Sequence, residues 1–224
     1  MPLVVAQSDM SDGNMYNRHD MFDQSVIDNR TAFLAAHTID MRQTTRLKVM
    51  FDRQDFCIYS EIDETTKGHG MQDDECIIAD ALITTHPNHA LFLPVADCVG
   101  ASIYDPDHQV LALAHLGRHS LEQDGASKII MHLVRHYGSD PSRLHVQLTP
   151  AAGKDTYKIW ALANMGMKEA TLAQLAAAGI TPANITDNAV ETTSSRNHYS
   201  YSEFLKGNRD EDGDHAIVAM MTSK

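Results

Sequence analysis

Two segments carry side chains that are typical of catalytic and metal sites. Cys98 ends the triplet Ala96-Asp97-Cys98 after one apolar run, and His115 lies at the end of another. They are 17 residues apart, one strand out and one strand back, so we expect them to become neighbours. A thiol beside an imidazole is either a nucleophile with its base or two ligands of zinc or copper. The spacing alone also fits a buried cysteine and a core histidine with no chemical role.

The composition indicates a globular protein that binds no nucleic acid. The chain has 224 residues, of which 43% are hydrophobic, and 30 acidic against 18 basic side chains give a net charge of −12. Proteins that bind nucleic acid rely on lysine and arginine at the phosphates, so this balance argues against them. Three cysteines form no disulfide framework, and no segment is apolar enough to be a signal peptide or to span a membrane. We therefore expect a cytoplasmic protein.

The hydrophobic pattern predicts a mixed α+β domain. Short apolar runs predict strands at 90–95, 99–105, 109–115 and 144–148, with a last strand at 215–221. Helical spacing predicts helices over 25–36, 125–137 and about 160–178. Residues 46–51 and 55–62 read as two strands joined by a tight turn. We expect residues 1–24 to form an irregular N-terminal arm and residues 25–224 one domain of layered sheets and outer helices.

Several motifs, in order along the chain, resemble those of the bacterial laccase-domain family, which is also called polyphenol oxidase-like or YfiH-like. They cover most of residues 25–221. The motifs are Asn29-Arg30, Ala79-Asp80-Ala81 with the apolar residues that follow, Ala96-Asp97-Cys98, His115-Leu116-Gly117, the segment from Pro150 to Tyr157, and His198-Tyr199-Ser200-Tyr201.

The resemblance implies a fold, a metal and an activity. The fold would be an α/β/β/α layered single domain with mixed sheets. The metal, usually described as zinc, would be held by two histidines and a cysteine, of which Cys98 and His115 match by position. Members of this family are described as purine nucleoside phosphorylases that also deaminate adenosine. The family was first described as copper-dependent polyphenol oxidases.

This chemistry gives roles to residues near the cysteine and the histidine. A zinc ion with an open position activates water, which could attack C6 of adenine. Phosphorolysis instead needs a phosphate held beneath C1′ of the ribose, and Arg118 is the candidate that would hold it. Asp97 could hydrogen-bond a ligand or a protonated base.

The chain departs from the family pattern at the first histidine ligand. By strand alignment Asp52 stands at that position, and His69 follows between Gly68 and Gly70. Either side chain could supply the third ligand, since carboxylates also bind zinc. The third ligand could equally have been lost.

The arginine motifs of the family are also altered. Arg118 stands where the family has tryptophan, and His119 stands where it has arginine, so the phosphate clamp could have moved. The usual Gly-Arg near the C-terminus is Gly213-Asp214 here. Arg209 could replace that arginine, or it could be a solvated residue beside an acidic loop.

Four functions follow from these residues. The first is a zinc-dependent enzyme that acts on a purine nucleoside and phosphate. The second is a metal-free cysteine hydrolase or deamidase with Cys98 as nucleophile and His115 as base, which requires a depressed thiol pKa. The third is copper-dependent phenol oxidation, and the fourth is a non-catalytic descendant that binds a ligand.

Overall fold

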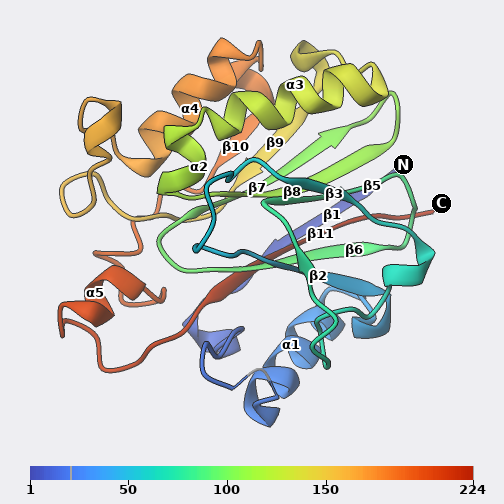
Figure 1. Cartoon of the computed structure of the whole chain (residues 1–224). Helices are drawn as coiled ribbons and strands as arrows, with labels where there is room; N and C mark the ends of the chain where they lie inside the picture. Colours follow the sequence, from blue (N-terminus) through green and yellow to red (C-terminus); the bar gives the residue numbers. More distant parts are fainter. Residues whose placement is uncertain (21, 224) are drawn as a thin grey trace.

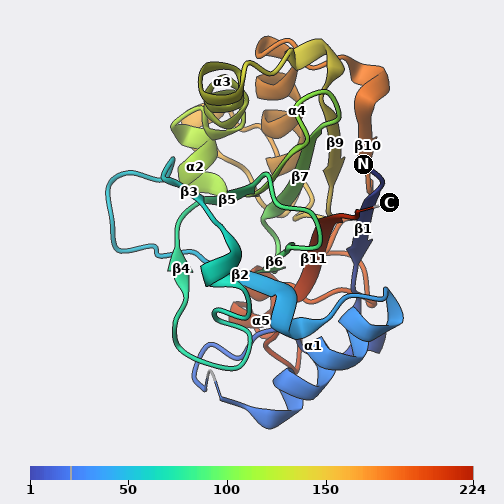
Figure 2. The same ribbon diagram turned by 90° about the vertical axis from the view of Figure 1, so that its right-hand side faces the viewer.

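The chain folds into four layers, helix–sheet–sheet–helix. The computed structural model describes residues 1–20 and 22–223. Two β-sheets stack face to face, α1 covers the outer face of one, and α3 and α4 cover the outer face of the other (Figures 1 and 2). This arrangement confirms the predicted α/β/β/α fold.

The first sheet has five strands and contains both ends of the chain. Its central strand β6 pairs antiparallel with β11 and parallel with β2. Its strand order is β1 (Leu3–Gln7), β11 (His215–Met221), β6 (Ala90–Val95), β2 (Thr44–Lys48) and β4 (Ile77–Ile78).

The second sheet has six strands and is built around the β7–β8 hairpin. Every residue of both hairpin strands is buried, because this sheet is covered on both faces. Its strand order is β10 (Ile185–Asp187), β9 (His145–Leu148), β7 (Val99–Asp105), β8 (Val110–Leu116), β5 (Ala81–Thr84) and β3 (Tyr59–Glu61).

The helices pack against the sheets through their apolar faces. The α-helices are α1 (Gln24–Ala36), α2 (Arg118–Glu122), α3 (Gly125–Tyr137), α4 (Met167–Ala177) and α5 (Tyr201–Leu205). Helix α3 buries Ile129, Ile130 and Leu133, as its spacing predicts. It ends at Gly138, whose φ of 74° is the left-handed conformation that glycine adopts at helix ends. Among the described residues, no helix has the length and apolar composition of a membrane span.

Three apolar cores separate the four layers. One contains α3 and α4 with residues of the second sheet such as Ile103, the next lies between the sheets, and the third packs α1 against residues such as Phe92. Cys98 contacts both the first and the second of these cores. The cysteine therefore lies where the two sheets meet the helices.

The predicted hairpin of residues 46–62 is wrong. Strands β2 and β3 belong to different sheets, and the segment between them crosses from one sheet to the other. The buried Asp80 fixes this crossing, because its carboxylate accepts the backbone N–H of Ile58 at 2.9 Å and forms an ion pair with Arg53. These partners are distant in sequence, so local pattern could not indicate them.

Two further boundaries differ from the prediction. Residues 3–7 of the expected arm form the edge strand β1, which pairs along its whole length with β11. The second predicted helix, expected over about 160–178, begins only at Met167. A 3-10 turn at Trp160–Leu162 precedes it, and Ala163 and Asn164 have positive φ angles that end helical geometry there.

Candidate functional site

The candidate site is a cavity of about 380 Å³ at one end of the two sheets. Its walls come from the ends of β2, β6 and β8, the loop between β6 and β7, helices α2 and α5, and the N-terminal arm. Its volume falls within the range of roughly 300–1,000 Å³ that is usual for small-molecule sites. The lining residues are Tyr16, Arg18, Arg46, Leu47, Lys48, Val49, Phe51, Leu93, Pro94, Val95, Ala96, Asp97, Cys98, His115, Arg118, His119, Tyr157, Met167, Tyr201, Ser202, Leu205 and Asp214.

The β7–β8 hairpin brings Cys98 and His115 together. His115 pairs with Gly100 across the hairpin, and Cys98 immediately precedes β7. Gly117 lies between the two side chains. A Cβ added to it would be 2.6 Å from Cε1 of His115 and 3.0 Å from the sulfur of Cys98. The absence of a side chain at position 117 therefore lets the thiol and the imidazole approach each other.

Both groups are held in their neutral forms. Burial, reinforced by the carboxylates of Asp97 and Asp214, raises the pKa of the Cys98 thiol to about 12. Burial, with the nearby Arg53 and His119, lowers the pKa of His115 to about 4. A hydrolase that uses Cys98 as its nucleophile needs the opposite shift of the thiol pKa. The electrostatics therefore do not support the metal-free hydrolase.

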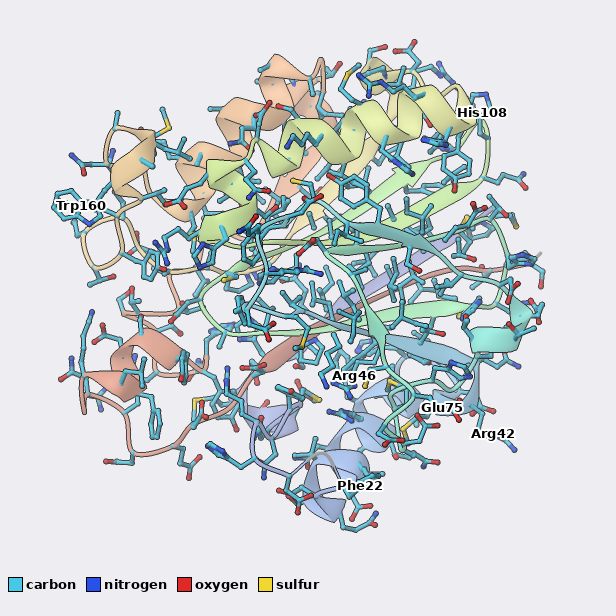
Figure 3. The ribbon with its side chains drawn as sticks, viewed as in Figure 1. Phe22, Arg42, Arg46, Glu75, His108 and Trp160 are labelled. Atoms are coloured by element: carbon cyan, nitrogen blue, oxygen red, sulfur yellow. The ribbon has the colours of Figure 1, made fainter. Side chains whose placement is uncertain are left out.

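The candidates for a third metal ligand lie outside the cavity. His69 faces Glu75, with 3.3 Å between Nε2 and a carboxylate oxygen, and Figure 3 shows Glu75 on the side of the molecule away from α5. Asp52 is exposed and does not line the cavity. Within residues 1–20 and 22–223, no three histidine, cysteine, aspartate or glutamate side chains are placed to hold a metal ion.

An aromatic ring stands beside His115 instead. The neighbour of Asp52, Phe51, points its ring edge-on to His115, with 6.0 Å between the ring centres and 77° between the planes. Phe51, on the β2–β3 connection, is therefore a side-chain neighbour of His115 that supplies no metal ligand. Cys98 and His115 are two donors where a zinc site needs three or four, so the residues present do not fit the zinc centre that the resemblance implies.

Arg118 and His119 both line the cavity. Arg118 lies 3.8 Å from Glu122 one turn later in α2, and His119 stacks on Phe56 with 4.7 Å between ring centres. Arg209 does not line the cavity. Its guanidinium donates to the backbone carbonyls of Thr193 and Ser195 at 3.2 and 2.9 Å, which makes it a support for the chain before α5.

Asp97 shapes the backbone next to the cysteine. Its φ of 72° is unusual for a residue other than glycine and is a conformation that surrounding contacts must hold. One carboxylate oxygen accepts the Thr192 hydroxyl at 2.6 Å, and the other accepts the backbone N–H of Ser202 at 2.7 Å. These bonds tie the loop of Cys98 to the start of α5 and leave Asp97 with few free acceptor positions.

The cavity also contains charged residues that the sequence analysis missed. Arg46 on β2 is 2% exposed, and its guanidinium donates to the Gly70 carbonyl and, at 2.9 Å, to the sulfur of Cys76. Arg30 of α1 is buried nearby, and its pKa falls to about 9 because of burial and the charge of Arg46. Among the described residues, no carboxylate forms an ion pair with Arg46 or Arg30. Arg46 therefore places a buried positive charge at the cavity wall, without an ion-pair partner among the described residues.

A buried ion pair closes another wall. Asp214, which precedes β11, accepts from Arg18 of the N-terminal arm at 2.5 Å, and Arg18 also bonds Asp212 and lies over the Tyr201 ring. Burial raises the pKa of Asp214 to about 6, although Arg18 acts in the other direction. The only sequence signal for Arg46 is an arginine within a predicted strand, and Arg18 gave none. Asp214 stood out only as the residue in place of the family's arginine.

Comparison with known proteins identifies the family. The family model described as multi-copper polyphenol oxidoreductase laccase matches residues 5–164. The chain belongs to this family. This chain shares its fold with solved structures. Hypothetical protein YfiH of Bacillus licheniformis superposes with a TM-score of 0.84 at 19% identity, over 98% of this chain and 93% of that one. YlmD from Geobacillus stearothermophilus superposes with a TM-score of 0.80 at 18% sequence identity, over 99% of this chain and 91% of that one.

One curated relative carries the name of an enzyme. Purine nucleoside phosphorylase Cgl2154/cg2365 of Corynebacterium glutamicum is 36% identical over 80 residues. The match covers 36% of this chain and 32% of that protein, so it spans about a third of the relative's length.

Proposed function

We propose that this protein is a purine nucleoside phosphorylase that uses the cavity beside Cys98 and His115. The observation that carries the proposal is the lining of this cavity. Four basic side chains (Arg18, Arg46, Lys48, Arg118) and four aromatic rings (Tyr16, Phe51, Tyr157, Tyr201) surround about 380 Å³. An anion beside an aromatic base is the ligand that this lining suits, and a nucleoside with phosphate has both parts.

In the proposed reaction a phosphate oxygen attacks C1′ of the ribose and the bond from C1′ to the purine nitrogen breaks. The bonding electrons leave with the base, which takes up a proton, and the products are the purine and ribose 1-phosphate. Arg46 and Lys48 are assigned to the phosphate, because the buried charge of Arg46 has no carboxylate partner among the described residues. Arg118, which begins α2 and also lines the cavity, is assigned to the same anion.

Asp214 is assigned to the departing base. A carboxyl group with a pKa near 6 is partly protonated near neutral pH, so it can donate a proton to a purine nitrogen as the base leaves. Arg18 holds this carboxyl group in place and limits the rise of its pKa. The neutral Cys98 and His115 would complete the floor of the cavity and contact the ribose.

No step in this scheme passes through zinc, because the donors at the site do not fit that ion. Deamination of adenosine and oxidation of phenols each require an activated metal centre in the family pattern. These reactions are therefore outcomes that the assay can detect rather than parts of the proposal.

The test is chromatography of purified protein incubated with adenosine, inosine or guanosine, with and without phosphate. We expect phosphate-dependent release of the base with an equal amount of ribose 1-phosphate. Lys48→Gln should raise the KM for phosphate by about tenfold, as loss of a charged hydrogen bond does. Arg42→Gln, which removes an exposed arginine outside the cavity, is the matched control and should have no effect.

Three results would count against the proposal. Inosine formed from adenosine without phosphate would indicate deamination. Base release that does not need phosphate would indicate a hydrolase. If all three nucleosides stay intact while one of them still binds, the cavity is a binding site without catalysis.

A further inference from the structure

A second hollow lies between α3 and β3, apart from the cavity described above. Its volume is about 360 Å³, and it shares no lining residue with the first cavity. Figure 1 shows α3 passing across the sheet above β3. The lining residues are Cys57, Tyr59, Asp124, Ser127, Lys128, Met131, His132, Arg135 and His136. We call it the α3 groove.

The α3 groove concentrates positive charge on an acidic molecule. Lys128 and Arg135 are exposed and lie two helical turns apart on one face of α3. Nine other lysines and arginines form ion pairs with carboxylates. Within the part of the chain that the structure describes, neither Lys128 nor Arg135 has such a partner within 4.0 Å.

Two histidines lie between these cations. The rings of His132 and His136 stack with 4.1 Å between their centres, and the edge of His132 meets Tyr59 at 5.1 Å. Burial and the neighbouring His136 lower the pKa of His132, while Glu61 acts in the other direction. Asp124 is the carboxylate on the groove wall, and its oxygen already accepts from Ser127 at 2.9 Å.

A tyrosine hydroxyl in the groove has only a weak partner. The hydroxyl oxygen of Tyr59 is buried, and its polar neighbour is the thiol of Cys57, which also lines the groove. Burial raises the pKa of Tyr59, so the group stays a neutral donor. A thiol is a weak acceptor, and an anion in the groove would supply a stronger one.

We infer that the α3 groove binds a compact phosphate-bearing anion. Lys128 and Arg135 would hold it from two sides, and the Tyr59 hydroxyl would donate to one of its oxygens. Protonation of His132 would add charge, so binding should strengthen as the pH falls. Asp55, Glu61 and Asp124 are the acidic groups around the groove that oppose this attraction.

The test is a titration of the full chain with pyrophosphate, followed by the ring proton signals of the histidines in NMR spectra. His132→Gln and His136→Gln assign the two signals. Both signals should shift in a saturable way, and affinity should be about fivefold higher near pH 6 than near pH 8. Titrations with inorganic phosphate and with a nucleoside diphosphate show whether a free phosphate or a nucleotide is the better ligand.

Matched variants locate the binding site. Arg135→Gln should weaken pyrophosphate binding by about fivefold and Tyr59→Phe by a smaller factor. Arg196→Gln removes another exposed arginine without an ion pair among the described residues and should leave the affinity unchanged. Equal losses in Arg135→Gln and Arg196→Gln, or no shift of the His132 and His136 signals, would overturn the inference. Nucleoside turnover should be the same in all these variants, which separates this site from the proposed function.

Discussion

Phe51 decides whether the cavity can hold a metal. Its ring faces His115 and is 62% exposed, so a histidine could replace it without strain in the core. Phe51→His should complete a three-ligand zinc site with Cys98 and His115. We expect the variant to retain one zinc per chain after dialysis, and to bind zinc at least about 100-fold more tightly than the unchanged protein in competition with a chelator.

Phe22→His is the matched control, because Phe22 is similarly exposed (56%) and does not line the cavity. It should not change zinc affinity. Stoichiometric zinc in the unchanged protein, lost in Cys98→Ala, would contradict our assignment of Phe51.

Phe51 also shows what the sequence could and could not predict. Strand spacing correctly brought Cys98 and His115 together, but strand alignment chose Asp52 rather than Phe51 as the residue beside them.

At the scale of elements, the β2–β3 connection is fixed by one buried carboxylate. Asp80 is 2% exposed and holds both Arg53 and the backbone of Ile58. Asp80→Ala leaves the partly buried guanidinium of Arg53 and a backbone N–H without their acceptor, so we expect a loss of about 3 kcal/mol in the free energy of unfolding. Denaturant titration measures it. Asp107→Ala breaks the exposed pair with Arg143 and should cost less than about 1 kcal/mol. Similar losses in the two variants would show that Asp80 does not fix the crossing.

The elements that local pattern predicted well are those with continuous apolar runs or a clear helical period. Strands β6, β7, β8 and β11 and helix α3 were all expected within a residue or two of their observed bounds. The strands that were misplaced have partners far away in sequence. β1 pairs with the last strand of the chain, and β3 pairs with β5 rather than with β2. The cavity also depends on contacts between residues far apart in sequence, because Arg18 and Asp214 are hydrogen-bonded although they are 196 positions apart.

At the scale of the whole molecule, three buried histidines make stability depend on pH. Burial lowers the pKa of His89 and His115 to about 4 and that of His215 to about 3. An unfolded chain protonates these residues near pH 6.5, whereas the folded chain does so only below about pH 4. Between these values the unfolded state binds more protons, so the free energy of unfolding must fall as the pH falls. Asp214 opposes the trend between about pH 4 and 6, because its folded pKa is raised. Three groups outweigh one, and the net effect is loss of stability in acid.

Denaturant titrations from about pH 7 to about pH 4.5 measure how steeply the free energy of unfolding falls with pH. His215→Gln, which removes a fully buried ring whose two nitrogens have no partner among the described residues, should reduce the slope by about one proton. Asp214→Asn should instead steepen it, and an unchanged slope in both variants would mean that other groups control acid unfolding.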